Sequence, residues 1–253
     1  MLEIENLTAG YRGREVLHSL SLTLEAGELT CIVGPNGCGK STLLKAALGL
    51  IPRTEGEVRV DGEVLFRLRR KEIARRIAYL AQGPEIPAMT VEQMVLHGRF
   101  PYLDPLRGYT AHDRELARAA MEKVGISHLA AEPMASLSGG MRQTVFTAMA
   151  LVQDTPYILL DEPTAYLDIA HQVGLMKLLK AIASEGRGVA AVLHDLPLAL
   201  TFADRVAVME QGSIIAVGSP REIARSGVIG KVFGVDVRED RGEFSCRLRD
   251  VQD

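Results

Sequence analysis

The sequence predicts an α/β fold: a mostly parallel sheet with flanking helices, an N-terminal antiparallel β subdomain and an inserted α-helical lobe. Three patterns predict it. Short apolar runs, typical of buried strands, alternate with helical segments, as in parallel sheets that are covered on both faces. Residues 1–30 instead alternate apolar and polar side chains, which indicates antiparallel strands. Residues 83–155 are rich in helical patterns and mark the inserted lobe.

The expected elements follow one another along the chain. A buried strand at 29–33 leads into a helix at 42–48, and a hairpin turning at Asp61-Gly62 joins 56–60 to 63–65. The charged run at 67–76 is expected to be the solvated face of a helix. The remaining expected elements are the helices of 111–153, interrupted at 125–127 and 133–140, and strands at 157–161, 189–193, 205–210 and 214–217.

The composition excludes several classes of protein. A hydrophobic share of 47% and a charged share of 24% are ordinary globular values, and the net charge of -3 gives no support to a general nucleic-acid binder. The three cysteines lack any C-x-x-C spacing, which favours a reduced protein without disulfides or structural zinc. The acidic, amphipathic start is unlike a signal peptide, and no apolar run approaches the ~18 residues of a membrane span. A role at a membrane would therefore need a separate spanning chain.

A glycine-rich loop between the first buried strand and the following helix fits the pattern G-x-x-x-x-G-K-[ST]. Glycines let backbone N–H groups turn toward phosphate oxygens, and the helix N-terminus adds a positive dipole. Lys40 can reach the β- and γ-phosphates, and the Ser41 hydroxyl can complete a Mg²⁺ shell. The pattern predicts a P-loop NTPase core that binds a nucleoside triphosphate. The predicted nucleotide-binding residues of this loop are Gly34, Pro35, Asn36, Gly37, Cys38, Gly39, Lys40, Ser41 and Thr42.

Two adjacent carboxylates end the apolar run at 157–161. A buried strand presents such acids at the carboxyl end of the sheet, where ligands of open α/β folds bind. Asp161 is placed to hold Mg²⁺, and Glu162 is placed to polarise the attacking water as a general base.

A third motif, Leu137-Ser138-Gly139-Gly140-Met141, precedes a helix that Ser138 is expected to cap. Together with the loop and the acidic strand end, it makes the chain resemble the ATP-binding cassette (ABC) family of transporter ATPases. The resemblance covers about residues 1–235 as one ATPase domain, with the helical lobe at about 83–155 inserted in it. Residues 236–253 are expected to be a short C-terminal extension.

The resemblance implies roles for further residues. Tyr11 is similar to the aromatic residue that stacks on adenine, and Gln82 to the lid glutamine that links Mg²⁺ and the attacking water to the lobe. His194 resembles the histidine that touches the γ-phosphate, so Glu162, His194 and Gln82 form the expected catalytic set, and Ser41, Gln82 and Asp161 the expected metal set. The residues implied to contact nucleotide bound to the opposite subunit are Ser138, Gly139, Gly140, Met141 (where the family commonly has Gln) and Asp168.

The resemblance also implies partners. The motif Leu137-Ser138-Gly139-Gly140-Met141 resembles the signature motif of that family, and a chain with one phosphate loop and one signature motif needs a second copy, arranged head to tail, to enclose two ATP molecules. Separate membrane permease subunits are expected to dock near 83–110, through the exposed members of an apolar set of which several are expected to pack the lobe's own core: Met89, Val91, Met94, Leu96, Phe100, Tyr102 and Leu103. A substrate-binding protein is implied indirectly, nucleic acid is not, and the chain is expected to be peripheral on the cytoplasmic side of the membrane.

The stretches at 90–102 and 194–220 are similar to the importer branch for iron–siderophores, haem and cobalamin. Three alternatives remain: a non-transport cassette ATPase of DNA repair, chromosome organisation or translation, an importer subunit for another small solute, and a small-molecule kinase. The first would show long coiled coils, a second cassette or paired-cysteine modules, and the sequence has none of these. The kinase would leave the Ser-Gly-Gly motif and His194 without a purpose.

Overall fold

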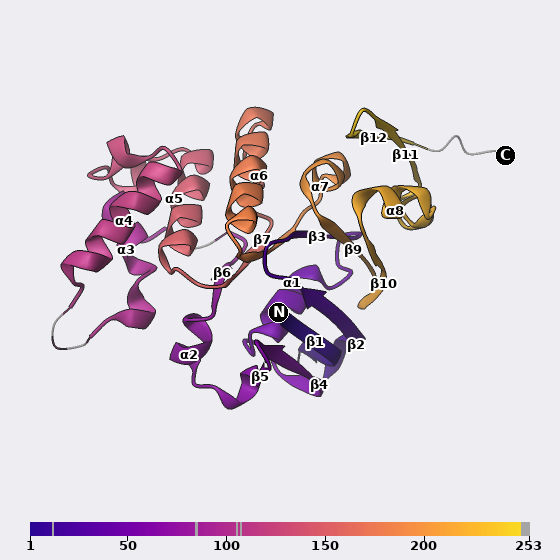
Figure 1. Ribbon diagram of the computed structural model, residues 1–253, viewed down its shortest axis with the longest axis horizontal. Coiled ribbons are helices and arrows are strands. Elements are labelled where there is room, and N and C mark those ends of the chain that lie inside the picture. Colours follow the sequence, from indigo (N-terminus) through magenta and orange to yellow (C-terminus); the bar gives the residue numbers. More distant parts are fainter. Residues whose placement is uncertain (12, 84–85, 105, 107, 249–253) are drawn as a thin grey trace.

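A parallel sheet with one antiparallel edge strand forms the centre of the computed structural model, which describes residues 1–11, 13–83, 86–104, 106 and 108–248 (Figure 1). Five neighbouring strands run parallel, and the sixth pairs antiparallel at one edge. In spatial order the strands are β10 (Ser213–Gly218), β9 (Arg205–Glu210), β3 (Leu29–Val33), β8 (Gly188–Val192), β7 (Tyr157–Asp161) and β6 (Ile77–Leu80). This arrangement, with helices on both sides, confirms the predicted fold class.

The N-terminal segment forms a separate four-stranded antiparallel sheet. The predicted hairpin is present and turns at Asp61 and Gly62, whose φ angles of 50° and 80° are the left-handed values of a tight hairpin turn. In spatial order the strands are β2 (Arg14–Leu24), β1 (Leu2–Tyr11), β4 (Arg53–Val60) and β5 (Glu63–Val64).

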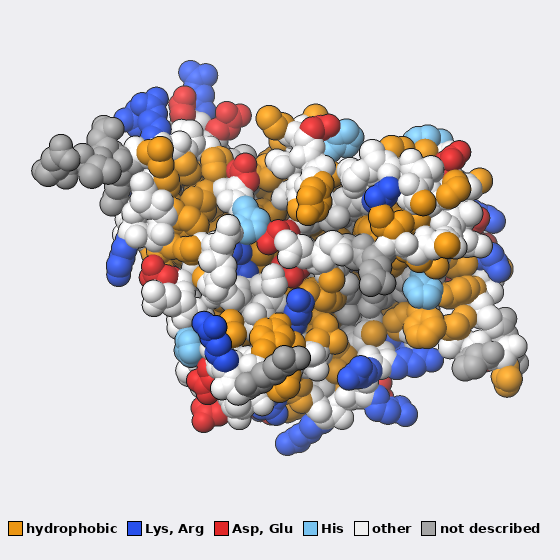
Figure 2. All heavy atoms as spheres, turned by 180° about the vertical axis from the view of Figure 1, so that it is seen from behind, with side chains coloured by type: hydrophobic (Ala, Val, Ile, Leu, Met, Phe, Trp, Pro, Cys, Tyr) orange, Lys and Arg blue, Asp and Glu red, His pale blue; other side chains and the backbone are white. Residues whose placement is uncertain are grey.

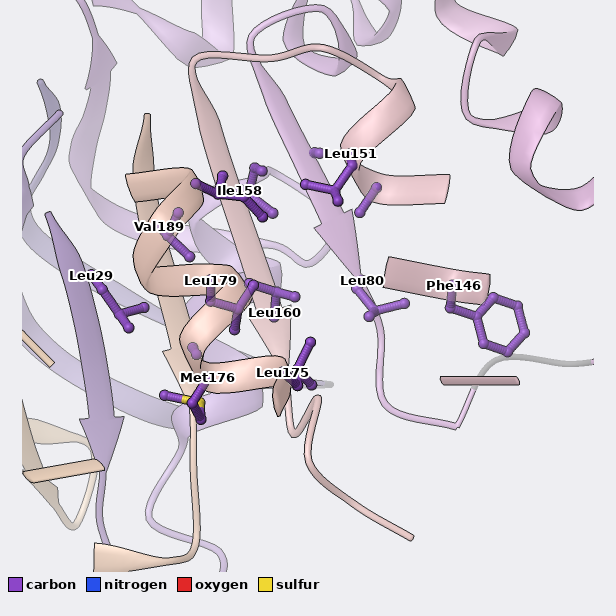
Figure 3. Packing of buried hydrophobic residues seen from close by; sticks show 14 of the residues in the cluster. Leu29, Leu80, Phe146, Leu151, Ile158, Leu160, Leu175, Met176, Leu179 and Val189 are labelled. Atoms are coloured by element: carbon purple, nitrogen blue, oxygen red, sulfur yellow. The ribbon is translucent and has the colours of Figure 1, made fainter. Parts of the chain in front are cut away.

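Successive side chains along the central strands point to opposite faces of the main sheet, so the core is divided into two layers. In β3, Ile32 packs with the antiparallel sheet and with α1 (Lys40–Ala47), whereas Leu29 packs on the opposite face. On that second face, α6 (Ile169–Ser184) contributes Met176 and Leu179 against the strands, as Figure 3 shows. The antiparallel sheet, α1, the main sheet and α6 are therefore stacked in that order.

The helical lobe lies between β6 and β7 in the chain and at one end of the molecule (Figure 1). Its helices are α3 (Val91–His97), α4 (Ala111–Lys123) and α5 (Gly139–Val152), with 3-10 turns η2 (Phe100–Tyr102), η3 (Ser127–Leu129) and η4 (Met134–Ser136). Each helix is capped by a hydroxyl residue: the Thr90, Thr110 and Ser138 side chains each accept a hydrogen bond from the backbone N–H of the residue three positions later. Inside the lobe, Arg99 and Asp113 form an ion pair at 2.9 Å, each side chain only 8% exposed.

Two segments differ from the expected elements. The charged run contains only a short helix, α2 (Arg70–Ala74), after the 3-10 turn η1 (Leu65–Arg67), because β6 begins at Ile77. The second is the stretch expected to be a short C-terminal extension, for which no element was predicted: its described part forms an antiparallel hairpin of β11 (Val235–Asp240) and β12 (Glu243–Leu248). This hairpin follows α7 (Leu196–Phe202), α8 (Pro220–Arg225) and α9 (Val228–Phe233), and its Phe244 is buried. Within the part of the chain that the structure describes, no helix has both the length and the apolar character needed to cross a membrane.

Candidate functional site

The phosphate-loop pattern occupies the turn between β3 and the N-terminus of α1. Gly37 and Gly39 have φ angles of 77° and 107°, which residues with a side chain rarely adopt. Gly34 has no positive φ angle, but a Cβ atom there would lie 2.4 Å from the Met209 carbonyl oxygen of β9. The glycines are therefore required by the backbone path, which leaves the loop N–H groups close to any bound anion.

Lys40 is the first residue of α1 and is 5% exposed. Its Nζ donates hydrogen bonds to the carbonyl oxygens of Gly34 at 2.7 Å and Pro35 at 3.0 Å. The Cys38 side chain is buried beneath the loop, where burial raises the pKa of its thiol, and the Cys38 carbonyl accepts a bond from Gly212 N at 2.9 Å. The ammonium group thus lies against the loop, where it also donates to the Cys38 sulfur at 4.0 Å.

A hydroxyl–carboxylate pair connects the loop to the acidic end of β7. The Ser41 hydroxyl donates to Asp161 Oδ1 at 2.8 Å, and the Tyr79 hydroxyl donates to Asp161 Oδ2 at 3.4 Å. Burial raises the pKa of the Asp161 carboxyl, and the neighbouring Glu162 charge adds to the rise. A nearby cation would reverse this shift.

These oxygen donors suit Mg²⁺, which prefers hard ligands and is usually held by one or two carboxylates together with phosphate oxygens and water. No cluster of three or more His, Cys, Asp or Glu side chains that could hold a metal occurs among the described residues. A dedicated all-protein metal cage is therefore absent from that part of the chain, whereas a shared nucleotide–magnesium site fits Ser41 and Asp161.

Glu162 follows β7 with a φ angle of 52°, a strained value for a residue with a side chain. Its Oε2 accepts a hydrogen bond from Gln82 Nε2 at 2.6 Å, and its Oε1 lies 2.6 Å from His194 Nε2. Gln82 comes shortly after β6 and His194 shortly after β8, the two strands that flank β7. The three side chains meet because the carboxyl ends of parallel strands share one edge of the sheet.

A cavity of about 500 Å³ brings these groups together. It is lined by Val16, Asn36, Gly37, Gly39, Lys40, Ser41, Thr42, Gln82, Glu162 and His194. Sequence reasoning missed Val16, which reaches the cavity because β2 packs against the loop at Gly39. It also gave no role to Tyr79. The position of Tyr79, three residues before Gln82 on the strand that leads to the site, was the feature that could have indicated one.

Other predicted residues lie outside this cavity. Tyr11 ends β1 and is 43% exposed. Ser138 caps α5 by accepting from Met141 N at 3.3 Å, beside Gly139 and Gly140, and none of these four residues lines the cavity.

Asp168 is also outside the cavity and caps α6. Its Oδ1 accepts from His171 N at 2.9 Å, and its Oδ2 lies 2.8 Å from His171 Nδ1, so these bonds hold the pKa of the Asp168 carboxyl below its usual range. The neighbouring Tyr166 is 86% exposed. Within one chain, the signature residues and the phosphate loop therefore do not form one site.

The chain matches known proteins over most of its length. A family model described as "ABC transporter" matches residues 17–165. The chain is 42% identical to the ferric enterobactin transport ATP-binding protein FepC of Escherichia coli, over 91% of this chain and 86% of that protein. It is 39% identical to the hemin import ATP-binding protein HmuV of Nocardia farcinica, over 92% of this chain and 80% of that one.

The fold also matches solved structures. One is the dimeric structure of MJ0796, a bacterial ABC transporter cassette, with a TM-score of 0.77 and 30% identity, covering 87% of this chain and 99% of that one. The phosphate loop, the acidic end of β7 and these similarities lead to one assignment: this chain belongs to the ABC transporter family and is an ATP-binding, ATP-hydrolysing subunit of that family.

Proposed function

We propose that this chain hydrolyses ATP, as a head-to-tail homodimer, to drive import of a metal chelate through separate membrane permease subunits. The observation that carries the proposal is the Glu162 carboxylate, held between Gln82 and His194 above the phosphate loop, in a chain whose relatives are named for siderophore and haem import.

The chemistry follows from the positions of the side chains. Lys40 balances charge on the β- and γ-phosphates, and the loop N–H groups hold their oxygens. Glu162 orients a water molecule and accepts its proton while the water oxygen attacks the γ-phosphorus and the bond to ADP breaks. His194 donates a hydrogen bond toward the γ-phosphate region, and the products are ADP and inorganic phosphate. Mg²⁺ held by Ser41 and Asp161, with Gln82 nearby, supplies charge stabilisation of the phosphates when bound.

A second copy would complete each nucleotide site. Ser138 and Gly139 are exposed and Gly140 is half-buried, and none of them lines the cavity. Tyr166, which is largely exposed, lies beside Gly139. A head-to-tail partner would bring its Ser138, its Met141 backbone and its Asp168 to the open side of the cavity, while Tyr11 would supply the adenine stack. The similarity to a dimeric cassette supports this arrangement.

The permease surface is proposed at two neighbouring apolar cavities rather than at the whole of 83–110. Of the seven apolar side chains in that segment, Val91, Met94 and Leu96 are buried in the lobe core, as expected for several of them, so they are not part of a docking surface. Phe100 is 59% exposed and lines a cavity of about 600 Å³ with Leu103 and α2 residues, and Phe66 and Ile73 line a second one of about 390 Å³. Residues 84–85, 105 and 107 of the predicted segment lie outside the described residues.

The cargo assignment to an iron–siderophore, haem or cobalamin rests on the relatives' names for the first two and on the sequence resemblance for cobalamin. The proposed setting is the cytoplasmic face of the cell membrane, with cargo delivered to the permease by a separate binding protein. A cassette ATPase without transport function, or an importer subunit for another solute, is the competing function.

Uptake in cells that lack this chain tests the proposal. Labelled ferric siderophore, haem and cobalamin are supplied in turn, with an amino acid and a sugar as controls. Loss of uptake of one chelate, with both controls unchanged, supports the assignment. Unchanged uptake of all three chelates, alongside loss of either control, overturns the cargo while leaving the ATPase assignment in place.

A further inference from the structure

The C-terminal hairpin of β11 and β12 packs on the rest of the fold through one face. Phe244, 9% exposed, belongs to the core cluster that contains the apolar side chains of α7, and Val235, Val237 and Cys246 pack against that cluster. The residues that alternate with them are exposed. In Figure 2, blue and red side chains gather at the upper left, where the half-turn brings the hairpin. The hairpin therefore has an apolar inner face and a charged outer face.

The strand β12 lies against α7, the helix that follows His194 (Figure 1). With seven residues, α7 is too short to be stable without tertiary packing. Its packing partners include β3 of the main sheet, α6 and β12. The position of α7 therefore depends in part on the hairpin.

The first turn of α7 begins directly after His194. Asp195 caps the helix, because its Oδ1 accepts a hydrogen bond from Leu198 N at 2.7 Å. Burial raises the pKa of the Cys246 thiol, and the Asp195 charge adds to the rise, so this part of β12 lies near the cap. A displacement of the hairpin would consequently reach the backbone that carries His194.

The His194 ring is held by few contacts of its own. Its Nε2 lies 2.6 Å from Glu162 Oε1, and its side chain is 46% exposed. Among the residues that the structure describes, Glu162 is the one polar partner of this ring. With its second nitrogen free of such a partner, the imidazole takes its orientation chiefly from the backbone. A shift of α7 would therefore move the ring relative to the carboxylate.

We propose that the C-terminal hairpin positions His194: Phe244, by fixing α7, holds the imidazole at the Glu162 carboxylate. Phe244 is buried in the core and does not line the nucleotide cavity, so it is a positioning residue that acts through His194. The inference rests on the proposed role of His194 in hydrolysis. Because α1, which begins at Lys40, packs on the opposite face of the main sheet, nucleotide binding should not depend on Phe244.

NMR of the histidine rings in the purified full-length chain tests the proposal directly. The chain has six histidines, and the His194 signal is identified by its loss in His194→Ala. We expect Phe244→Ala to move this signal and Phe244→Leu, which refills most of the space, to restore it. Should Phe244→Ala not fold, Phe244→Val carries the same measurement.

Steady-state ATP hydrolysis supplies a second measurement on the same variants. Phe244→Ala should lower kcat by about tenfold and change the KM for ATP by less than about twofold, because misplacing a catalytic group impairs the chemical step more than binding. Phe244→Leu should recover most of kcat. A rise in KM with kcat unchanged would overturn the proposal.

The control is Leu22→Ala in β2, which removes a 4% exposed side chain from the antiparallel sheet, on the face of the main sheet opposite α7. It should lower the melting temperature but leave the His194 signal and kcat near those of the wild type. An unmoved His194 signal in Phe244→Ala, or equal movement in both variants, would overturn the proposal, since the hairpin would then only stabilise the fold. Normal hydrolysis by His194→Ala would instead count against the proposed function, while the ring signal would still report whether the hairpin holds His194.

Discussion

The Gln82 side chain donates a hydrogen bond to the Glu162 carboxylate at 2.6 Å. Gln82 lies on the segment that leads from β6 toward the helical lobe, and Glu162 directly follows β7. A rotation of the lobe would therefore move the partner of the proposed catalytic carboxylate directly. Under the proposed function, this bond would let docking at the lobe change ATP hydrolysis.

Replacing Glu162→Gln should lower ATP hydrolysis by about 10²-fold or more, because the amide keeps the shape but cannot accept a proton from water. Nucleotide binding should survive, since Lys40 and the loop are unchanged, and a dimer locked with ATP should accumulate. Steady-state phosphate release measures the rate, and size-exclusion chromatography with ATP measures the dimer. A near-normal rate would show that another group is the base.

A mixture of two inactive variants should regain partial activity if the sites are shared. Ser138→Arg places a bulky cation where the partner's γ-phosphate belongs, and Lys40→Ala removes a phosphate partner from the loop. In a mixed dimer one site carries both changes and the other carries neither. Phosphate release by the mixture, after subunit exchange verified by two different tags, is the readout. Absence of rescue in verified mixed dimers would argue that each chain forms a complete site alone.

Replacing Phe100→Asp should abolish transport in the assembled complex while the melting temperature stays near that of the wild type, because the ring is 59% exposed. Val91→Asp is the contrasting change: Val91 is fully buried, so an unpaired carboxylate there should destabilise the lobe by several kcal/mol. Transport in reconstituted vesicles and thermal melting separate the two. If Phe100→Asp melts as early as Val91→Asp, Phe100 belongs to the core.

Replacing Asp113→Asn should destabilise the protein in a pH-dependent way. Burial alone would raise the pKa of the Asp113 carboxyl, but hydrogen bonds from Thr110 and the ion pair with Arg99 outweigh it and lower that pKa. A lowered folded pKa contributes stability that is present above the unfolded pKa of about 4 and is lost as the pH falls through the folded value. Urea unfolding should therefore show a penalty for the variant near neutral pH that shrinks below about pH 4. A loss of unfolding free energy in the variant that is the same near neutral pH and below about pH 4 would contradict the lowered pKa of Asp113.

The sequence predicts those features whose cause is local. Gly37 and Gly39 of the phosphate loop have φ angles that only glycine adopts readily, and the strand ending in Asp161 follows from its apolar run. The turn at Asp61 and Gly62 has the same kind of local cause.

Features with a tertiary cause were not predictable in the same way. Val16 enters the cavity because two sheets pack together, and the bond between Tyr79 and Asp161 depends on β6 lying beside β7. Val91 and Met94 face the lobe core although they stand in a segment that the sequence assigned to docking, because helical spacing places them on one buried stripe with Val95. The proposed position of Ser138 opposite a partner's phosphate loop needs a second copy, so only the resemblance to a family, and no local pattern, could predict it.

Complementation of chelate uptake is the most direct test that hydrolysis at this site drives import. Cells lacking the chain receive either the wild type or Glu162→Gln, at matched levels verified by immunoblot, and uptake of the chelate whose transport was lost is measured. The account predicts that the wild type restores uptake and that Glu162→Gln does not, although it reaches the membrane and binds ATP. Restoration of uptake by Glu162→Gln to the wild-type level would contradict it.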